Sequence, residues 1–399
     1  MQKFSLLICL LFLCSARGQD HNPELTNTLQ KLYQKSGFPG FAVAVVNENG
    51  VVYQHAFGYA DVKNKLPYKT NSVQNIGSIS KTFIGVALMK AIELGYFTVD
   101  TEVNSVLPFQ VSNPNFPGIP LTIRQLATHT SSIVDDENVY SKTFYPNLYS
   151  DVKSPLYQKF LKTSTTPGRT DTELSGFLKS YLSADGNLYK PTNFDTKKPG
   201  TAYHYSNIAS ALAAYLIEIK SKMPFDVFCQ KYIFEPLQLK QTSWKLNDSI
   251  AKNHVKIYNR KKQDYPLYSE ITYPDGSLKT SINDLSTYLI EMIKGYNGNG
   301  QLLSQSSFEN LFRKQFQDDQ LPIGYDPKEP NSGIFWRIKG NGQMGHTGSD
   351  LGVTTFMFFD PKTKIGKIFL TNMEFDEPEK GDVDQKLVAQ FVAIWKALD

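Results

Sequence analysis

The chain has 399 residues, of which 41% are hydrophobic and 13% aromatic. This content suffices for a large globular core and excludes an intrinsically disordered chain. The formal net charge of +4 at pH 7 is small for this length, so it gives no reason to expect nucleic acid or an anionic membrane as a partner.

The first eighteen residues have the composition of a secretory signal peptide. Lys3 precedes an apolar run over residues 4–13, and small residues around Ser15 and Gly18 offer a cleavage site. The run is short for a membrane span, although a retained anchor is the alternative. We therefore predict a signal peptide over residues 1–18, a secreted mature chain (periplasmic or extracellular in a bacterial host) and no stable membrane span. Removing Lys3 and Arg17 lowers the net charge from +4 to +2.

The mature chain begins with a predicted helix and a β-hairpin. Residues 25–33 form a short helical stretch, and residues 41–46 and 51–58 are rich in β-forming side chains. The turn Asn47-Glu48-Asn49-Gly50 separates them, and an Asn-Gly pair between two such runs is typical of a hairpin.

Gly77-Ser78-Ile79-Ser80-Lys81 begins a predicted helix that continues through Met89 toward Gly95. Ser78 and Lys81 are three residues apart, so they lie on the same helical face, about 5–6 Å from each other. An amine at that position can share the proton of a serine hydroxyl, and a helix N-terminus favours an anion formed there. The Ser-x-x-Lys spacing recurs, without this setting, at Ser150/Lys153 and Ser249/Lys252.

The middle of the chain is predicted to be helical with one long irregular stretch. Residues 121–131 read as a capped helix that ends in a polar turn, in which His129 is expected to be buried and to hold backbone groups. Periodicity weakens over residues 133–198, where aromatic side chains lie among polar ones. This stretch either packs over the body of the protein or covers a substrate cleft.

Further helices and strands complete a predicted α+β fold. The helices are expected over residues 208–219, 224–237, 284–294 and 383–398, and the strands over residues 333–339, 353–359 and 366–370. Strands at both chain ends predict one antiparallel sheet that is flanked by helices and interrupted by a helical insertion. We expect one catalytic domain over residues 19–399, with a sheet subdomain (about 19–105 and 275–399) and a helical subdomain (about 106–274).

Cysteine and histidine usage indicates no disulfide and no metal site. Cys229 is the one cysteine outside the predicted signal peptide, and its apolar neighbours favour a buried thiol. The six histidines are scattered without metal-ligand spacing. The Gly-x-Gly-x-x-Gly pattern at residues 340–345 lacks the βαβ context of a nucleotide site, so we interpret it as a turn between strands. No Gly-x-Ser-x-Gly elbow occurs. No cofactor is expected.

Five motifs occur in a fixed order along residues 38–374. They are Gly77–Lys81, Leu126-Ala127-Thr128-His129-Thr130-Ser131, Pro199-Gly200-Thr201 with Tyr205-Ser206-Asn207, Phe234-Glu235-Pro236-Leu237, and Gly345-His346-Thr347-Gly348. Together they resemble the serine β-lactamase and penicillin-binding-protein superfamily, most closely the class C β-lactamase-related branch that includes esterases and D-stereospecific peptidases.

The resemblance implies a role for each matching residue. Ser78 would be the acylated nucleophile, Lys81 its proton-sharing partner, and Tyr205 the general base and later acid. Asn207 would bind the substrate together with residues 346–348, which are His346, Thr347 and Gly348. The backbone N–H groups of Ser78 and Ser349 would form the oxyanion hole.

Two residues depart from the class C pattern. His346 stands where class C β-lactamases usually have lysine. Histidine at this position is familiar in the esterase and peptidase relatives, and we expect His346 to be partly charged near neutral pH. Asp350 follows the same strand and could repel an anionic substrate.

We therefore predict a secreted serine hydrolase that cleaves an ester or amide of a small molecule or peptide through a Ser78 acyl-enzyme. A D-alanyl-D-alanine-type carboxypeptidase or a true β-lactamase is the alternative within the enzymes. A non-catalytic penicillin-binding or sensor module is the alternative of another class. No nucleic-acid partner is expected.

Overall fold

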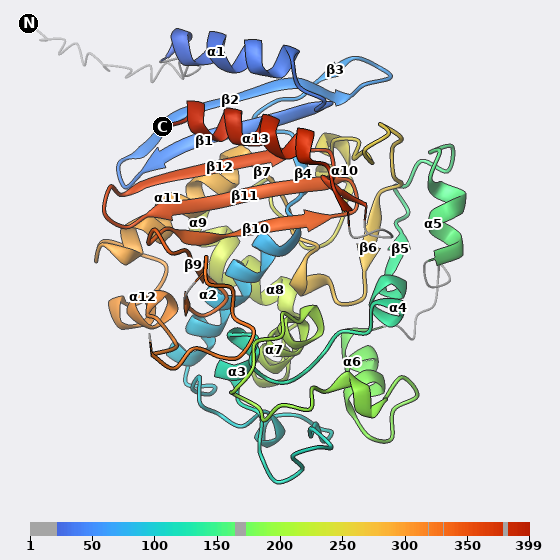
Figure 1. Cartoon of the computed structure of the whole chain (residues 1–399), viewed down its shortest axis with the longest axis vertical. Helices are drawn as coiled ribbons and strands as arrows, with labels where there is room; N and C mark the ends of the chain where they lie inside the picture. Colours follow the sequence, from blue (N-terminus) through green and yellow to red (C-terminus); the bar gives the residue numbers. More distant parts are fainter. Residues whose placement is uncertain (1–21, 164–172, 318, 330, 378–381) are drawn as a thin grey trace, which may run out of the picture.

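The computed structural model describes residues 22–163, 173–317, 319–329, 331–377 and 382–399, and these pack into layers of helices around one large sheet (Figure 1). The predicted signal peptide over residues 1–18 lies outside the described residues. None of the helices in the described part of the chain is long and apolar enough to cross a bilayer.

The core of the fold is an eight-stranded sheet whose strands follow the order β3-β2-β1-β12-β11-β10-β9-β8. Its strands are β1 (Gly40–Asn47), β2 (Gly50–Asp61), β3 (Leu66–Pro67), β8 (Asn331–Ser332), β9 (Arg337–Ile338), β10 (Met344–Asp350), β11 (Val353–Asp360) and β12 (Ile365–Thr371). Neighbouring strands are antiparallel, and the N-terminal strand β1 pairs with the C-terminal strand β12, with Ala44 opposite Ile368. The prediction of one antiparallel sheet built from both chain ends is confirmed.

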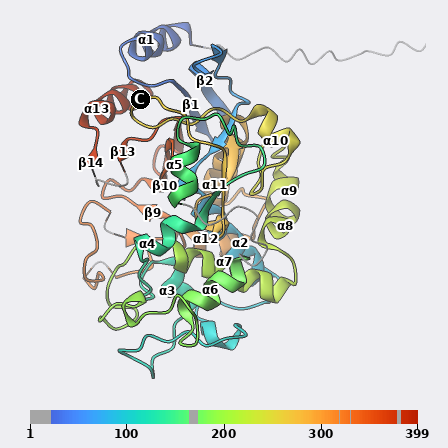
Figure 2. The same cartoon turned by 90° about the vertical axis from the view of Figure 1, so that its right-hand side faces the viewer.

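Helices cover both faces of this sheet. One face is covered by α1 (Pro23–Gln34) and α13 (Gln385–Ala397), and the other by α2 (Ser80–Glu93) and α11 (Ile282–Tyr296) (Figures 1 and 2). Strand β1 shows why both layers are needed, since its residues from Gly40 to Val46 are all buried. A strand buried on both faces has a continuous apolar sequence instead of an alternating one.

The remaining elements are short helices and two-stranded ribbons. The other α-helices are α3 (Ile123–Ala127), α4 (Glu137–Tyr140), α5 (Tyr157–Thr163), α6 (Leu174–Leu182), α7 (Asn207–Ser221), α8 (Phe225–Cys229), α9 (Glu235–Leu237), α10 (Asp248–Asn253) and α12 (Gln305–Phe312). The 3-10 helices are η1 (Gly77–Ile79), η2 (Val103–Ser105), η3 (Ser141–Thr143), η4 (Pro191–Asn193) and η6 (Tyr273–Asp275). The ribbons pair β4 (Val73–Asn75) with β7 (Lys279–Ser281), β5 (Phe144–Pro146) with β6 (Tyr268–Glu270), and β13 (Asp376–Glu377) with β14 (Asp382–Val383).

Helix α2 occupies the centre of the molecule. Its residues from Ser80 to Met89 are all buried, which explains why its sequence is apolar on every side. It packs against α7 and α12 and lies beneath β10 in Figure 1. The helix expected from Gly77 therefore exists, but its first turn is the 3-10 helix η1, and the α-helical part begins at Ser80.

Three segments differ from the predicted elements. The helix expected over residues 224–237 is interrupted by the π-helical turn η5 (Gln230–Phe234) between α8 and α9. Of the strand expected over residues 333–339, only β9 forms; β8 lies just before that range, and Phe335 between the two strands has a left-handed backbone with a φ of 57°. The stretch 133–198 was expected to be irregular, yet it contains α4, α5 and α6.

Candidate active site

The turn that carries Ser78 lies directly against strand β10. Gly77 has a φ of 53°, and a Cβ atom added there would lie 3.0 Å from the backbone N of Ser349. A Cβ atom added at Gly348 would lie 2.1 Å from the carbonyl oxygen of Ile76. Both positions therefore need glycine for the turn and the strand to approach each other so closely. As a result the half-buried Ser78 lies next to the backbone of Gly348 and Ser349.

Lys81 joins three parts of the chain through its ammonium group. Its Nζ atom lies 3.0 Å from Ser78 Oγ, 2.7 Å from Asn207 Oδ1 and 2.7 Å from the carbonyl oxygen of Asp275. The side chain is fully buried, and these three acceptors match the three hydrogens of an ammonium group. The structure thus brings together Ser78, Lys81 and Asn207, three of the residues that the resemblance names.

Asp135 holds Asn207 in place and was not identified from the sequence. Its carboxylate accepts hydrogen bonds from Ser206 Oγ at 2.6 Å, from the backbone N of Asn207 at 2.6 Å and from the backbone N of Ile208 at 3.3 Å. A carboxylate at the N-terminus of α7 accepts hydrogen bonds from the free N–H groups of the first turn and interacts favourably with the helix dipole. Burial raises the pKa of Asp135 to about 6, although these hydrogen bonds oppose the rise.

Tyr205 lies among cations, and its hydroxyl is free. The ring centroid is 5.0 Å from Lys81 Nζ and 5.5 Å from the guanidinium carbon of Arg337, and the ring of His129 is 4.4 Å away. The hydroxyl is buried and has no hydrogen-bond partner among the described residues. Tyr205 is therefore next to Lys81, but its hydroxyl is not hydrogen-bonded to Ser78 Oγ in this structure.

His129 is a buried residue of the turn after α3, as the sequence suggested. Its backbone is left-handed with a φ of 56°, and its Nδ1 atom accepts a hydrogen bond from the backbone N of Ser206 at 3.2 Å. Burial lowers the pKa of His129 well below its usual value, and the charges of Lys81 and Arg337 add to this effect. The imidazole is therefore neutral at neutral pH. In this form Nδ1 can accept the hydrogen bond from Ser206, which fixes the backbone next to Tyr205.

His346 lies on β10, and our expectation that it is partly charged near neutral pH is wrong. Only 2% of the residue is exposed, and Nδ1 lies 2.5 Å from the carbonyl oxygen of Thr347. Burial, then Arg337, then Lys81 lower the pKa of His346 well below its usual value. A neutral imidazole donates to the Thr347 carbonyl through Nδ1, so Nε2 is left as an acceptor.

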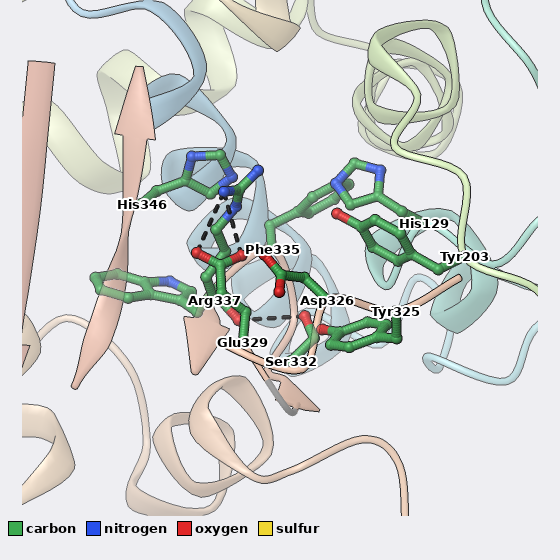
Figure 3. Close-up of a pocket in the computed structure, with 10 residues that line it drawn as sticks. His129, Tyr203, Tyr325, Asp326, Glu329, Ser332, Phe335, Arg337 and His346 are labelled. Carbon is green, nitrogen blue, oxygen red and sulfur yellow. Dashed lines mark hydrogen bonds and ion pairs between the residues drawn. The ribbon is translucent and has the colours of Figure 1, made fainter. Parts of the chain in front are cut away.

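A small pocket of about 30 Å³ opens between His129 and His346 (Figure 3). Arg337 and Glu329 both line it and form an ion pair, with Arg337 Nη1 3.2 Å from a Glu329 carboxylate oxygen. The remaining lining residues are Tyr203, Tyr325, Asp326, Ser332, Phe335 and Trp336. Arg337 was not among the residues predicted for the site; its one distinguishing feature in the sequence is a charge inside a strand-forming stretch.

Ser349 is the exposed residue that follows Gly348 on β10, opposite Thr354 of β11. Its hydroxyl donates to Asp376 Oδ2 at 3.1 Å. The next residue, Asp350, turns back and accepts a hydrogen bond from the backbone N of Leu351 at 2.7 Å. Acidic side chains therefore adjoin the end of the strand whose backbone faces Ser78.

Within the described residues, no group of three or more His, Cys, Asp or Glu side chains is arranged to hold a metal ion. Cys229 is a free, fully buried thiol on α8, as predicted. Burial raises its pKa well above the usual value, which keeps the thiol protonated.

Comparisons with known proteins identify the family of this chain. The family model described as Beta-lactamase matches residues 25–391. The chain is 25% identical over 370 residues to the human mitochondrial serine beta-lactamase-like protein LACTB, covering 83% of this chain and 66% of that protein. It is 26% identical over 384 residues to penicillin-binding protein 4* of Bacillus subtilis, covering 90% of this chain and 73% of that protein. The chain thus spans about two thirds of the length of LACTB.

A solved structure supports the same fold. The octameric penicillin-binding protein homologue from Pyrococcus abyssi superposes with a TM-score of 0.70, covering 93% of this chain and 76% of that chain. The sequence identity of 20% limits this comparison to the fold.

Proposed function

Because the chain belongs to the beta-lactamase family, we propose that it is a secreted serine hydrolase that cleaves an ester or amide through an acyl-enzyme on Ser78. The observation that carries this proposal is the position of Lys81 Nζ, 3.0 Å from Ser78 Oγ and 2.7 Å from Asn207 Oδ1. The buried ammonium group donates to Ser78 Oγ and so holds the nucleophile in place, while Asn207 fixes the ammonium group.

The first half of the reaction forms a covalent ester on the enzyme. Ser78 Oγ attacks the substrate carbonyl carbon while its proton passes to the oxygen of Tyr205, the general base, and Lys81 holds Oγ in place. The backbone N–H groups of Ser78 and Ser349 stabilise the oxyanion that forms. The intermediate then collapses, and the leaving group takes the proton from Tyr205 as the carbonyl is restored.

The second half releases the acid. A water molecule gives a proton to Tyr205 and attacks the acyl carbon, and Ser78 Oγ recovers its proton as it leaves. The positive charges of Lys81 and Arg337 beside the Tyr205 ring support this role, because a developing phenolate is stabilised by cations. The unpartnered Tyr205 hydroxyl is free to make these bonds once a substrate is present.

Charges around the pocket favour a neutral substrate. His346 is neutral where class C β-lactamases usually have lysine, and Arg337 is already paired with Glu329. An anionic substrate would therefore meet no unpaired cation other than Lys81 among these residues, and it would approach Asp350 and Asp376 near Ser349. We infer that neutral esters and amides are preferred.

A carboxypeptidase or β-lactamase activity is the second candidate, and Arg337 is the observation that favours it. Its guanidinium faces the pocket, and exchange of Glu329 for a substrate carboxylate would supply the missing cation (Figure 3). Comparing kcat/KM for an ester and for the same ester bearing a carboxylate separates the candidates. A preference for the charged substrate would support this second activity.

Turnover of neutral aryl esters tests the proposal. We expect Ser78→Ala to lower kcat/KM by about 10³-fold or more, since no other hydroxyl replaces the nucleophile. The matched control is Ser249→Ala, the exposed serine of another Ser-x-x-Lys pair, which should keep full activity. Absence of turnover in the unmodified protein across esters, amides and β-lactams would favour a non-catalytic binding module. Mass analysis of the chain recovered from its host tests removal of residues 1–18.

A further inference from the structure

Ionisable side chains gather around Asp275, whose carbonyl oxygen accepts a hydrogen bond from the Lys81 ammonium. They come from separate elements: Tyr140 on α4, Tyr268 and Glu270 on β6, Asp275 on η6, Lys279 on β7 and Asp350 on β10. Glu270, Asp275 and Lys279 are each at most 3% exposed. The hydrolytic steps proposed for Ser78 use none of these side chains.

The Asp275 carboxyl group has an incomplete set of hydrogen bonds. Its Oδ1 atom accepts from the Tyr140 hydroxyl at 2.9 Å, while Oδ2 is buried and has no partner among the described residues. The residue is fully buried. An ionised oxygen without donors is costly in such a place, whereas a protonated carboxyl group carries no charge.

The neighbouring acids make ionisation of Asp275 still less favourable. Both Glu270 oxygens accept hydroxyl hydrogens, from Thr272 and Ser277 at 2.9 Å each, which is the pattern of an ionised carboxylate. A Cβ atom added at Gly276, the residue after Asp275, would lie 3.7 Å from Glu270 Oε2 and 3.8 Å from Asp350 Oδ2. The carboxylates of two other elements thus reach the backbone next to Asp275.

The lysine of the cluster does not pair with Asp275. Lys279 Nζ donates to the carbonyl oxygens of Ser277 at 2.8 Å and Trp244 at 3.2 Å. The three acids therefore outnumber the one lysine, apart from Lys81 itself. Burial first and then Glu270 raise the pKa of Asp275 well above its usual value, and the same two causes raise that of Asp350 to about 7.

We propose that Asp275 is a positioning residue for Lys81 and that it acts as a neutral carboxylic acid. Its carbonyl oxygen fixes the ammonium group, and Tyr140 fixes the residue through Oδ1. The neutral side chain leaves the positive charge of Lys81 uncompensated, so that this charge can stabilise negative charge near Ser78 Oγ. An ionised Asp275 would stabilise the ammonium form and oppose the negative charge that develops at Tyr205 and the oxyanion. This proposal rests on the proposed function.

The consequence is a fall in activity at alkaline pH, caused by ionisation of Asp275. The charged and titratable groups that face Asp275 are Lys81, Tyr140 and Glu270, with Asp350 and Lys279 behind Glu270. Asp275→Asn keeps the Oδ1 acceptor and is permanently neutral, so the alkaline limb of kcat/KM should move up by about one pH unit. Glu270→Gln removes the nearest negative charge and lets Asp275 ionise more easily, so the limb should move down.

Opposite shifts in these two variants are the result that supports the proposal. If Asp275 had a purely structural role, both substitutions would change stability, but the alkaline limbs of their kcat/KM profiles would not shift in opposite directions. Equal limbs in the unmodified protein and Asp275→Asn would overturn the proposal, as would shifts in the same direction. Asp275→Ala should lower kcat by about 10-fold or more with little change in KM, because alanine loses the Oδ1 contact with Tyr140 that fixes the carbonyl oxygen beneath Lys81, and no substrate contact is lost. An unchanged kcat would contradict the positioning role.

A measurement without turnover separates this proposal from the proposed function. The infrared C=O stretch of a protonated carboxyl group should appear at pH 7 in the difference spectrum between the unmodified protein and Asp275→Asn. Its absence would overturn the neutral state of Asp275 whether or not the protein is a hydrolase. Its presence in a protein that turns over no ester would leave Asp275 neutral as inferred and refute the hydrolase function instead.

Discussion

Asp135→Ala tests whether a buried carboxylate holds the N-terminus of α7 in place for the active site. The carboxylate accepts three hydrogen bonds, including two from backbone N–H groups, at 2.6, 2.6 and 3.3 Å. Each buried donor that loses its partner costs about 1–3 kcal/mol, and water can enter this partly buried site and replace some of them. We expect the free energy of unfolding to fall by about 2–3 kcal/mol at pH 7.

The same substitution should also change the pH dependence of stability. The pKa of Asp135 is raised to about 6 in the folded protein, above its usual 3.8, so the folded state binds more protons between these values. Its contribution to stability is therefore full below about pH 4 and is lost as the pH rises through 6. From these two pKa values, the loss caused by Asp135→Ala should be about 1 kcal/mol larger at pH 5 than at pH 7.

Urea denaturation at both pH values is the assay, together with kcat at pH 7. Asp136→Ala is the matched control: this neighbouring acid pairs with Lys190 at 2.7 Å near the surface, and its loss should cost about 1 kcal/mol or less. Because Asn207 is fixed by Asp135, kcat should fall in Asp135→Ala and not in Asp136→Ala. Equal stability losses in the two variants, or unchanged kcat in Asp135→Ala, would refute the reasoning.

Three further predictions concern Tyr205, His346 and His254. Tyr205→Phe should lower acyl transfer by about 10²–10⁴-fold without changing stability, and unchanged turnover would remove Tyr205 as the base. His346→Lys adds a cation beside Arg337 and should raise kcat/KM for a carboxylated ester about 10-fold relative to the neutral ester; an unchanged ratio would exclude residue 346 from recognition. Burial lowers the pKa of His254 to about 4, so its contribution to stability, about 3 kcal/mol, is present above pH 6.5 and is lost as the pH falls through 4. Denaturation of His254→Gln should therefore depend less on pH between 7 and 4 than that of the unmodified protein, and identical slopes would contradict this assignment.

The sequence indicated those parts of the site that depend on local spacing. Ser78 and Lys81 are three residues apart on one helical turn, so their proximity follows from helix geometry. Asn207 lies 126 positions from Lys81, and only an ordered set of motifs could suggest their contact. The roles of Ser78, Lys81, Asn207, Tyr205 and Ser349 all stay predictions.

Residues that hold the site together were missed because their partners are distant in sequence. Asp135 binds Ser206 across 71 positions, and Asp275 binds Lys81 across 194 positions. No local pattern distinguishes these acids from surface ones. Arg337 was not singled out because its neighbours suggested an ordinary strand.

The fold was predicted best where the local sequence of an element, such as an apolar run or a turn signal, determines its structure. The apolar run of β1 and the Asn-Gly turn before β2 indicated the hairpin, and the antiparallel sheet followed from strands at both chain ends. The π-helical turn η5 and the left-handed Phe335 were not predicted, because tertiary packing and not local preference determines them. The division into subdomains near residues 105 and 275 remains a prediction.

Intact-protein mass spectrometry with a fluorophosphonate and with a penicillin tests the central claim most directly. We predict that the unmodified protein and Ser249→Ala gain the mass of one adduct and that Ser78→Ala gains none. An adduct that persists with penicillin would indicate a penicillin-binding peptidase, and one that is released would indicate a hydrolase that turns over. An adduct of equal yield in Ser78→Ala, or no adduct with either reagent, would contradict the assignment of Ser78 as the nucleophile.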